Sequence, residues 1–208
     1  MSSLFFINMG MKILEKILEF IVSMLSGKTL TEKVESESVE KPAVVEEHVK
    51  KEFVMENQIT KNFTLNELTY SATAVKKGIK NVPSEEEYKN MVTLCEKILQ
   101  PLREKLGKPI TINSCYRCDA LNKAVNGAKN SQHKTGKAAD IEIKGMSNYD
   151  LAVYIKNNFE FDQLILEYCD NLKNDINSGW VHVSYDSKGN RNQCLTINKS
   201  GTKIGLIK

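Results

Sequence analysis

Residues 131–143 read SQHKTGKAADIEI, and residues 180–183 read WVHV. The chain contains three histidines, of which His133 and His182 lie in these two stretches. Both stretches include an alternation of apolar and polar residues that is typical of half-buried β-strands. The pattern therefore predicts two strands that carry chemically active side chains on their polar faces.

The polar faces of these strands are expected to meet. Alternate side chains of a strand share one face, so Asp140 and His182 lie opposite the isoleucines and valines that face the core. Two adjacent strands can place Asp140 beside His182, and His133 can reach both from the loop before the first strand. Two imidazoles and a carboxylate suit Zn²⁺, and a site with three protein ligands leaves a fourth position open to water. We therefore expect one zinc ion per chain and a metal-dependent hydrolase.

The surrounding sequence predicts an α+β domain over residues 58–200. Hydrophobic periodicity and capping residues such as Thr64, Ser84 and Ser147 or Asn148 predict helices, at 63–69, 84–106, 119–125 and 148–158. Period-two patterns predict strands, at 110–115, 138–143, 163–168, 180–185 and 193–197. The links 168–180 and 185–193 suit hairpins. We expect a mainly antiparallel sheet with helices packed on one side and a zinc cleft on the other.

The composition is that of a globular protein, with 41% hydrophobic and 26% charged residues among 208. The net charge of +3 is uneven, because residues 1–57 carry 7 basic and 10 acidic side chains and residues 58–208 carry 22 and 16. A mildly basic domain favours an anionic polymer such as a cell wall or a nucleic acid, or simply has a solvated surface. No stripe of basic residues with interleaved aromatics indicates a nucleic-acid partner.

Five cysteines are present, and this odd number argues against a disulfide framework. The pair Cys115-x-x-Cys118 has no second such pair and no nearby histidine that would complete a zinc knuckle. We interpret the cysteines as ordinary thiols.

The N-terminal region is expected to lie outside the domain. Residues 1–25 include an amphipathic helical pattern that has too many charges to span a membrane. It is consistent with a membrane-surface or oligomerisation helix, with a signal or anchor segment, or with an upstream extension before a start at Met9 or Met11. Residues 26–57 have the composition of a charged, disordered linker, and residues 201–208 form a C-terminal tail. Oligomeric state and localisation stay open, because a phage protein released at lysis and an exported protein both fit.

The motifs around the expected ligands resemble those of a known family. The motif Ser131-x-His133-x-x-Gly136-x-Ala138-x-Asp140 with the later Trp180-x-His182 is similar to that of the zinc D-Ala-D-Ala carboxypeptidase-like metallopeptidases. This group includes phage endolysins that cut the L-alanyl-D-glutamate bond, and it resembles the Hedgehog signalling domain in fold. The resemblance covers about residues 60–200 and includes segments typical of the phage and prophage branch, at 63–68, 99–103, 114–117, 121–127 and 161–167.

The resemblance implies a site and a substrate. It implies that His133, Asp140 and His182 bind zinc, and that Arg117 binds a substrate carboxylate or polarises the scissile carbonyl. A planar guanidinium suits either role because it donates two parallel hydrogen bonds. The substrate would be the stem peptide of bacterial peptidoglycan, cut by a carboxypeptidase or an endolysin-type endopeptidase. A catalytically inactive, zinc-containing cell-wall-binding module is the alternative. Further substrate contacts are expected from Tyr116, Ser131, Gln132 and Trp180.

The chain departs from the family pattern at two positions. Many members carry an acidic residue three positions before the last histidine as the catalytic base, whereas this chain has Gly179 there. Glu167 is our first candidate for the base, because its strand should pair with that of His182, and Glu142 is the second. Cys115 stands where glycine is usual, and would narrow the pocket or add an oxidisable thiol.

Overall fold

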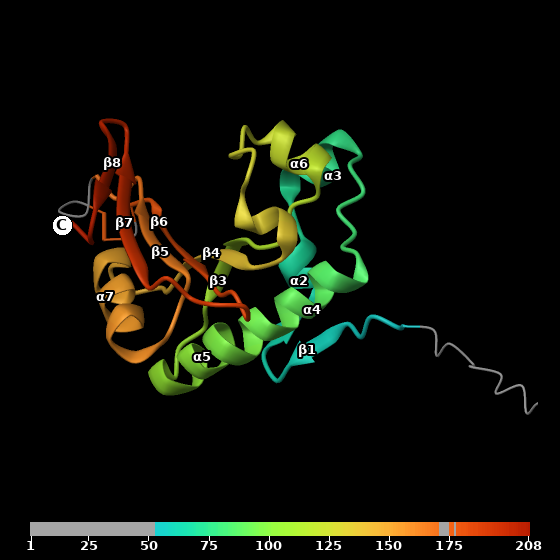
Figure 1. The fold of residues 1–208 in the computed structure, drawn as a ribbon, viewed down its shortest axis with the longest axis horizontal. Coiled ribbons are helices and arrows are strands. Elements are labelled where there is room, and N and C mark those ends of the chain that lie inside the picture. Colours follow the sequence, from blue (N-terminus) through green and yellow to red (C-terminus); the bar gives the residue numbers. More distant parts are fainter. Residues whose placement is uncertain (1–52, 171–174, 177) are drawn as a thin grey trace, which may run out of the picture. The chain divides into compact units, whose positions relative to one another are not determined.

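The described residues contain a six-stranded sheet with helices beside it (Figure 1). This computed structural model describes residues 53–170, 175–176 and 178–208. The helix expected in residues 1–25 and most of the expected linker lie outside the described residues. Among the helices in the described part of the chain, none is long and apolar enough to cross a membrane.

The strand order of the sheet is β3-β4-β6-β5-β7-β8, and every neighbouring pair is antiparallel except β5 and β7. The mainly antiparallel sheet is therefore confirmed. The ends of the five expected strands lie within one residue of those observed. The bounds are β3 (Thr111–Ser114), β4 (Ala138–Glu142), β5 (Gln163–Glu167), β6 (Trp180–Ser184), β7 (Gln193–Asn198) and β8 (Gly201–Ile204). A separate small sheet pairs β1 (Gln58–Thr60) with β2 (Phe63–Thr64).

The expected hairpin over the link 185–193 is wrong. Both edges of β6 are already bonded, one to β4 and the other to β5, so β7 cannot pair with β6. Instead β7 runs parallel to β5 along its free edge. Backbone bonds from Asn192 N to Phe161 O (2.9 Å) and from Gln193 N to Asp162 O (3.0 Å) hold the crossing in place. The residues expected to form a C-terminal tail include β8, which pairs with β7.

The helices begin where capping residues predicted. The hydroxyls of Thr64, Ser84 and Ser147 each accept a backbone N–H in the first turn, and Ser84 forms a complete capping box with Glu87. The bounds are α2 (Leu65–Thr69), α3 (Ala72–Lys77), α4 (Glu85–Leu94), α5 (Gln100–Leu106), α6 (Asp119–Ala124) and α7 (Asn148–Asn158). Two further segments are the π-helical η1 (Cys95–Leu99) and the 3₁₀-helical η2 (Gln132–Thr135). Sequence patterns predicted neither α3 nor η2, which are only one or two turns long.

The segments α4, η1 and α5 follow one another without a break, in place of the single expected helix. The turn before Pro101 is π-helical, and the N–H of Gln100 bonds to the carbonyl of Cys95. Proline has no N–H and its ring clashes with the carbonyl four residues earlier, so a wider turn at this point relieves the conflict. The helix ends at Gly107, which has φ 63°.

One face of the sheet is covered by α7 and by the α4–α5 segment. Ile141, Val181 and Val183 are fully buried in one cluster with leucines and isoleucines of these helices, as expected from the strand alternation. Figure 1 shows α7 beside β5 and β6 and α5 below β3. Burial of these alternate residues leaves Asp140 and His182 on the opposite face.

Candidate metal centre and cleft

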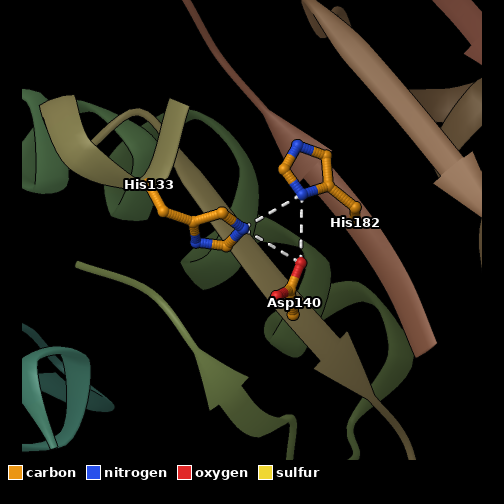
Figure 2. A group of neighbouring side chains, drawn as sticks. All are labelled: His133, Asp140 and His182. Carbon is orange, nitrogen blue, oxygen red and sulfur yellow. Dashed lines mark hydrogen bonds and ion pairs between the residues drawn. The ribbon is translucent and has the colours of Figure 1, made fainter. Parts of the chain in front are cut away.

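Strand pairing brings two of the expected zinc ligands together. In the β4–β6 pair Asp140 lies directly opposite His182. The third residue, His133, comes from η2, which precedes β4 in the chain. Figure 2 shows the three side chains converging from these elements, and all three are buried.

The position of η2 depends on Gly136. This residue ends η2 with φ 69°, and a Cβ atom there would lie 2.4 Å from the carbonyl oxygen of Glu87. Only glycine allows both the backbone conformation and this close approach to α4. The side chain of Asn90 adds a bond to the carbonyl of Thr135 at 2.9 Å. The glycine of the motif therefore fixes the element that carries His133.

The polar atoms of the three side chains face one another. His133 Nε2 lies 3.1 Å from Asp140 Oδ1 and 3.2 Å from His182 Nδ1, and His182 Nδ1 lies 3.0 Å from the same Asp140 oxygen. His133 Nδ1 lies 2.7 Å from the carbonyl oxygen of Cys115. Because that carbonyl can only accept, the proton of a neutral His133 is on Nδ1, and the Nε2 lone pair faces the other two groups.

Charge states in the cluster favour metal binding. Burial lowers the pKa of His133 despite the nearby Asp140 carboxylate, which favours neutral imidazole. Burial alone would raise the pKa of the Asp140 carboxyl, but His133 and His182 hold it well below its usual range. A neutral imidazole and an ionised carboxylate are the forms that coordinate a metal.

The three residues fit a zinc ion on this structural ground. A lone pair on His133 that faces a carboxylate oxygen and a second imidazole nitrogen places electron-rich atoms together in a buried position, which a cation would stabilise. Two nitrogens and one oxygen form the donor set of a zinc site with three protein ligands. Among the residues that the structure describes, these three form the group of histidine, cysteine or acidic side chains whose ligand atoms lie close enough together to bind one metal ion.

A cavity of about 410 Å³ opens on the cluster. Five of the residues expected from the sequence to act on the substrate line it together with the three ligands, and these are Arg117, Ser131, Gln132, Glu167 and Trp180. The structure does not bring Tyr116 into this cavity. Its side chain is buried, and its hydroxyl donates to a carboxylate oxygen of Glu87 at 3.0 Å.

Arg117 lines the cavity beside the ligand cluster. Its Nη2 is 3.7 Å from Asp140 Oδ2, and its backbone N–H bonds to the carbonyl of His133 at 3.1 Å. Its buried Nε has no hydrogen-bond partner in the structure. A guanidinium held in this way still has donors for a substrate carboxylate or carbonyl.

Gln132 is held by a residue that the sequence did not single out. Its Nε2 donates to Asp162 Oδ2 at 2.6 Å, and Arg191 donates to both oxygens of the same carboxylate at 2.6 Å. The Arg191 guanidinium lowers the pKa of Asp162 and so keeps the acceptor ionised. The ionised carboxylate fixes the orientation of the Gln132 amide, because only its NH₂ end can donate to Asp162.

The two candidate bases lie in different surroundings. Glu167 lines the cavity, and burial, with a smaller contribution from Asp140, raises the pKa of its carboxyl. Glu142 is not among the residues that line the cavity, and its carboxylate accepts from Asn113. Gly179 has φ 71°, and a Cβ atom there would lie 2.0 Å from the carbonyl oxygen of Glu167. This backbone therefore leaves no room for an acidic side chain three positions before His182.

The cysteines of the expected CxxC pair take structural positions. The five cysteines are unpaired thiols, and Cys115 is buried, which raises its pKa to about 12. Its contribution to the site is the backbone carbonyl that orients His133. Cys118 precedes α6, and its backbone N–H bonds to the side chain of Asn81.

Sequence reasoning missed three residues beside the cavity: Asp162, Tyr168 and Arg191. Asp162 lies in a segment that resembles the family, but nothing in the sequence showed its contact with Gln132. Tyr168 lines the cavity next to Trp180. An aromatic residue at the end of the strand expected over 163–168 was the only signal that the sequence offered.

The chain matches a known protein family. Residues 61–184, more than half of the chain, match a family model described as Peptidase M15. The matched range includes all three candidate ligands, Arg117 and Glu167. No curated protein matches the chain.

Proposed function

This chain belongs to the peptidase M15 family, and from that membership we propose that it is a zinc-dependent peptidase of peptidoglycan stem peptides. The observation that carries the proposal is the convergence of His133 Nε2, Asp140 Oδ1 and His182 Nδ1 at mutual distances of 3.0–3.2 Å beside a cavity. A D-Ala-D-Ala carboxypeptidase and an endolysin-type endopeptidase both fit this site.

A zinc ion held by His133, Asp140 and His182 would supply a Lewis acid and would make water a nucleophile near neutral pH. Glu167 accepts a proton from the attacking water and returns it to the leaving amine. Its raised pKa suits this exchange, because it makes the carboxylate a stronger base toward the attacking water, and the carboxyl that forms can still pass the proton to the more basic leaving amine. Arg117 binds the carbonyl or carboxylate oxygen of the substrate through its free donors.

A second candidate function is a zinc-containing cell-wall-binding module without turnover. Gly179, which replaces the usual acidic residue, is the observation that favours it. This alternative predicts bound zinc and wall binding, and no effect of changing Glu167. We propose no nucleic-acid partner, and a membrane-surface contact of residues 1–25 is a separate proposal.

The first test compares the wild-type chain with His133→Ala. We expect about one zinc per chain in the wild type and cleavage of muropeptides at one defined bond, both measured by mass spectrometry. His133→Ala should lose zinc and cleavage together, because a lost imidazole leaves two ligands. His48→Ala changes the third histidine and serves as the matched control, with zinc and cleavage unchanged.

The outcomes separate the two functions. Zinc-dependent cleavage that disappears in His133→Ala supports the peptidase and identifies the bond. Zinc and wall binding without cleavage supports the binding module. A chain that binds no zinc contradicts both.

A further inference from the structure

Tyr168, directly after β5, has an unusual backbone conformation. Its φ is 55°, in the left-handed region that bulky residues rarely adopt. Among the described residues, the other non-glycine residues with positive φ are Asn126 and Asn192. Asparagine tolerates this region because its short side chain bonds locally, whereas tyrosine has no such compensation.

Contacts on both sides hold Tyr168 in this conformation. Its backbone N–H bonds to the carbonyl of Ile197 in β7 at 2.8 Å, and its carbonyl accepts from the hydroxyl of Ser178 at 3.4 Å. Gly179 lies so close that a Cβ atom on it would be 2.6 Å from the carbonyl carbon of Tyr168. The surrounding chain thus imposes the strained conformation.

The conformation directs the Tyr168 ring to the cavity. The ring centroid lies 5.5 Å from that of Trp180 with an interplanar angle of 45°, and 43% of the residue stays exposed. Tyr168 and Trp180 line the cavity together with Ile165 and Ile197. The strand register places Glu167 between Trp180 and Ile197, so this wall of the cavity has apolar side chains beside the candidate base. The rest of the cavity lining includes the polar groups of Arg117, Ser131 and Gln132.

We propose that Tyr168 is a specificity-determining residue that, with Trp180, packs against an aliphatic side chain of the bound peptide. This inference rests on the proposed function and adds a subsite to it. Strained backbone persists where the surrounding structure imposes it, and it occurs most often at sites of function. An aromatic face provides contact area for aliphatic groups with little loss of side-chain freedom. The polar lining of the cavity then binds the peptide backbone and carboxylate.

The test separates the ring from the backbone strain through three variants. Tyr168→Phe keeps the ring, Tyr168→Ala removes the ring and keeps the strain, and Tyr168→Gly removes both. With the zinc-loaded protein and a synthetic stem pentapeptide, we expect Phe to match the wild type. Ala and Gly should raise KM equally, by roughly three- to tenfold, with kcat nearly unchanged.

Stability should follow a different order from KM. The Tyr168→Gly variant is expected to unfold at a temperature about 2–4 °C higher than the Tyr168→Ala variant, because glycine adopts positive φ without strain. A purely structural role would make KM and thermal stability change together. Tyr70→Ala is the matched control, since Tyr70 is 67% exposed and is not among the residues lining the cavity. It should leave KM unchanged.

Binding can be measured without turnover. Trp180 is the only tryptophan of the chain, so its fluorescence on rapid mixing with the pentapeptide reports occupancy of this wall. If the wild type binds the pentapeptide but does not cleave it, the proposed function fails. The subsite is still supported if Tyr168→Ala and Tyr168→Gly bind the peptide more weakly and Tyr168→Phe binds it normally. If Tyr168→Ala and Tyr168→Gly keep the wild-type KM and the wild-type binding, the peptidase activity still stands but the subsite is overturned. A Phe variant that binds poorly also overturns it, and so does a wild type that does not bind the peptide.

Discussion

At the scale of single residues, Glu167 has the position and the environment of a general base. It lines the cavity with the three ligands, and burial raises its pKa. We expect Glu167→Gln to lower kcat by roughly 10²- to 10⁴-fold, because the amide cannot accept the proton of the attacking water. The zinc content, measured by mass spectrometry of the native protein, should stay at the wild-type level. Steady-state hydrolysis of muropeptides measures the rate.

Two controls make this test specific. Glu142→Gln changes a carboxylate that bonds to Asn113 away from the cavity lining and should leave kcat unchanged. Gly179→Asp in the Glu167→Gln background should restore no activity, since a Cβ at 179 collides with the backbone of Glu167. Restored hydrolysis in the double variant would show that the base belongs at 179, and normal hydrolysis in Glu167→Gln would remove Glu167 from the mechanism.

The sequence predicted the residues whose placement depends on local periodicity. Alternation along β4 and β6 was enough to put Asp140 and His182 on one face, and the structure brings His133 to them. The Cys115 carbonyl beside His133 and the Asp162–Gln132 contact could not be predicted. These bonds join residues 18 and 30 positions apart through tertiary packing, which no local pattern contains.

At the scale of elements, η2 must stay against α4 if His133 is to face the other ligands. Gly136→Ala adds a Cβ atom 2.4 Å from the carbonyl oxygen of Glu87 in a residue with φ 69°. We expect zinc affinity to fall by roughly 10- to 100-fold, because His133 is displaced. A competition titration with a chelator measures this change. Stability should fall by more than the ~1–2 kcal/mol of left-handed strain alone.

The control for this element is Gly145→Ala. Gly145 has φ 76°, but no atom lies within 4 Å of the added Cβ. It should therefore lose about 1–2 kcal/mol of stability from strain and keep its zinc affinity. Equal zinc affinities in the two variants would show that the position of η2 does not control the site.

Asp162 joins three elements, since it precedes β5, binds Gln132 of η2 and binds Arg191 of the β6–β7 link. Hydrogen bonds from Arg191 lower the pKa of its carboxyl. Because this carboxyl has a lower pKa in the folded protein than in the unfolded protein, its contacts stabilise the fold fully above the unfolded pKa of about 3.9. This stability is lost progressively as the pH falls from there through the folded-state pKa. We expect Asp162→Asn to lose about 1–3 kcal/mol at pH 7, and to approach the wild type toward pH 3.

Denaturant unfolding at several pH values measures this difference. Both proteins are stripped of metal, so that zinc release at low pH does not contribute. A difference between wild type and Asp162→Asn that stays constant from pH 7 to pH 3 would contradict the assignment.

The pairing of β7 with β5 could not be predicted from the sequence of the individual elements. The sequence of residues 185–193 is compatible with a hairpin, and the strands on both sides were predicted within one residue. Which edge β7 pairs with depends on β4, which already occupies the outer edge of β6. Competition among strands for edges is a property of the whole sheet and is not encoded in the link.

At the scale of the whole molecule, packing of the domain begins before residue 58. The backbone N–H of Leu65 bonds to the carbonyl of Asn57 at 2.7 Å, and the Tyr88 hydroxyl bonds to the carbonyl of Glu56 at 3.0 Å. The ring of Phe53 packs on that of Tyr88 with centroids 5.7 Å apart. The boundary expected at residue 58 rested on composition, which changes gradually and does not report these contacts.

Two fragments test whether this unit contains the complete function. The fragment 53–208 keeps these N-terminal contacts and every residue of the cavity. We therefore expect its kcat/KM to lie within about twofold of that of the full chain, a smaller change than the loss of one hydrogen bond of about 1 kcal/mol would cause. The fragment 58–208 should hydrolyse the same bond but unfold several degrees lower, since each lost hydrogen bond contributes about 1 kcal/mol. Thermal unfolding and muropeptide hydrolysis of both fragments provide the comparison. Loss of hydrolysis by the fragment 53–208, with its zinc retained, would place an essential part of the activity in residues 1–52.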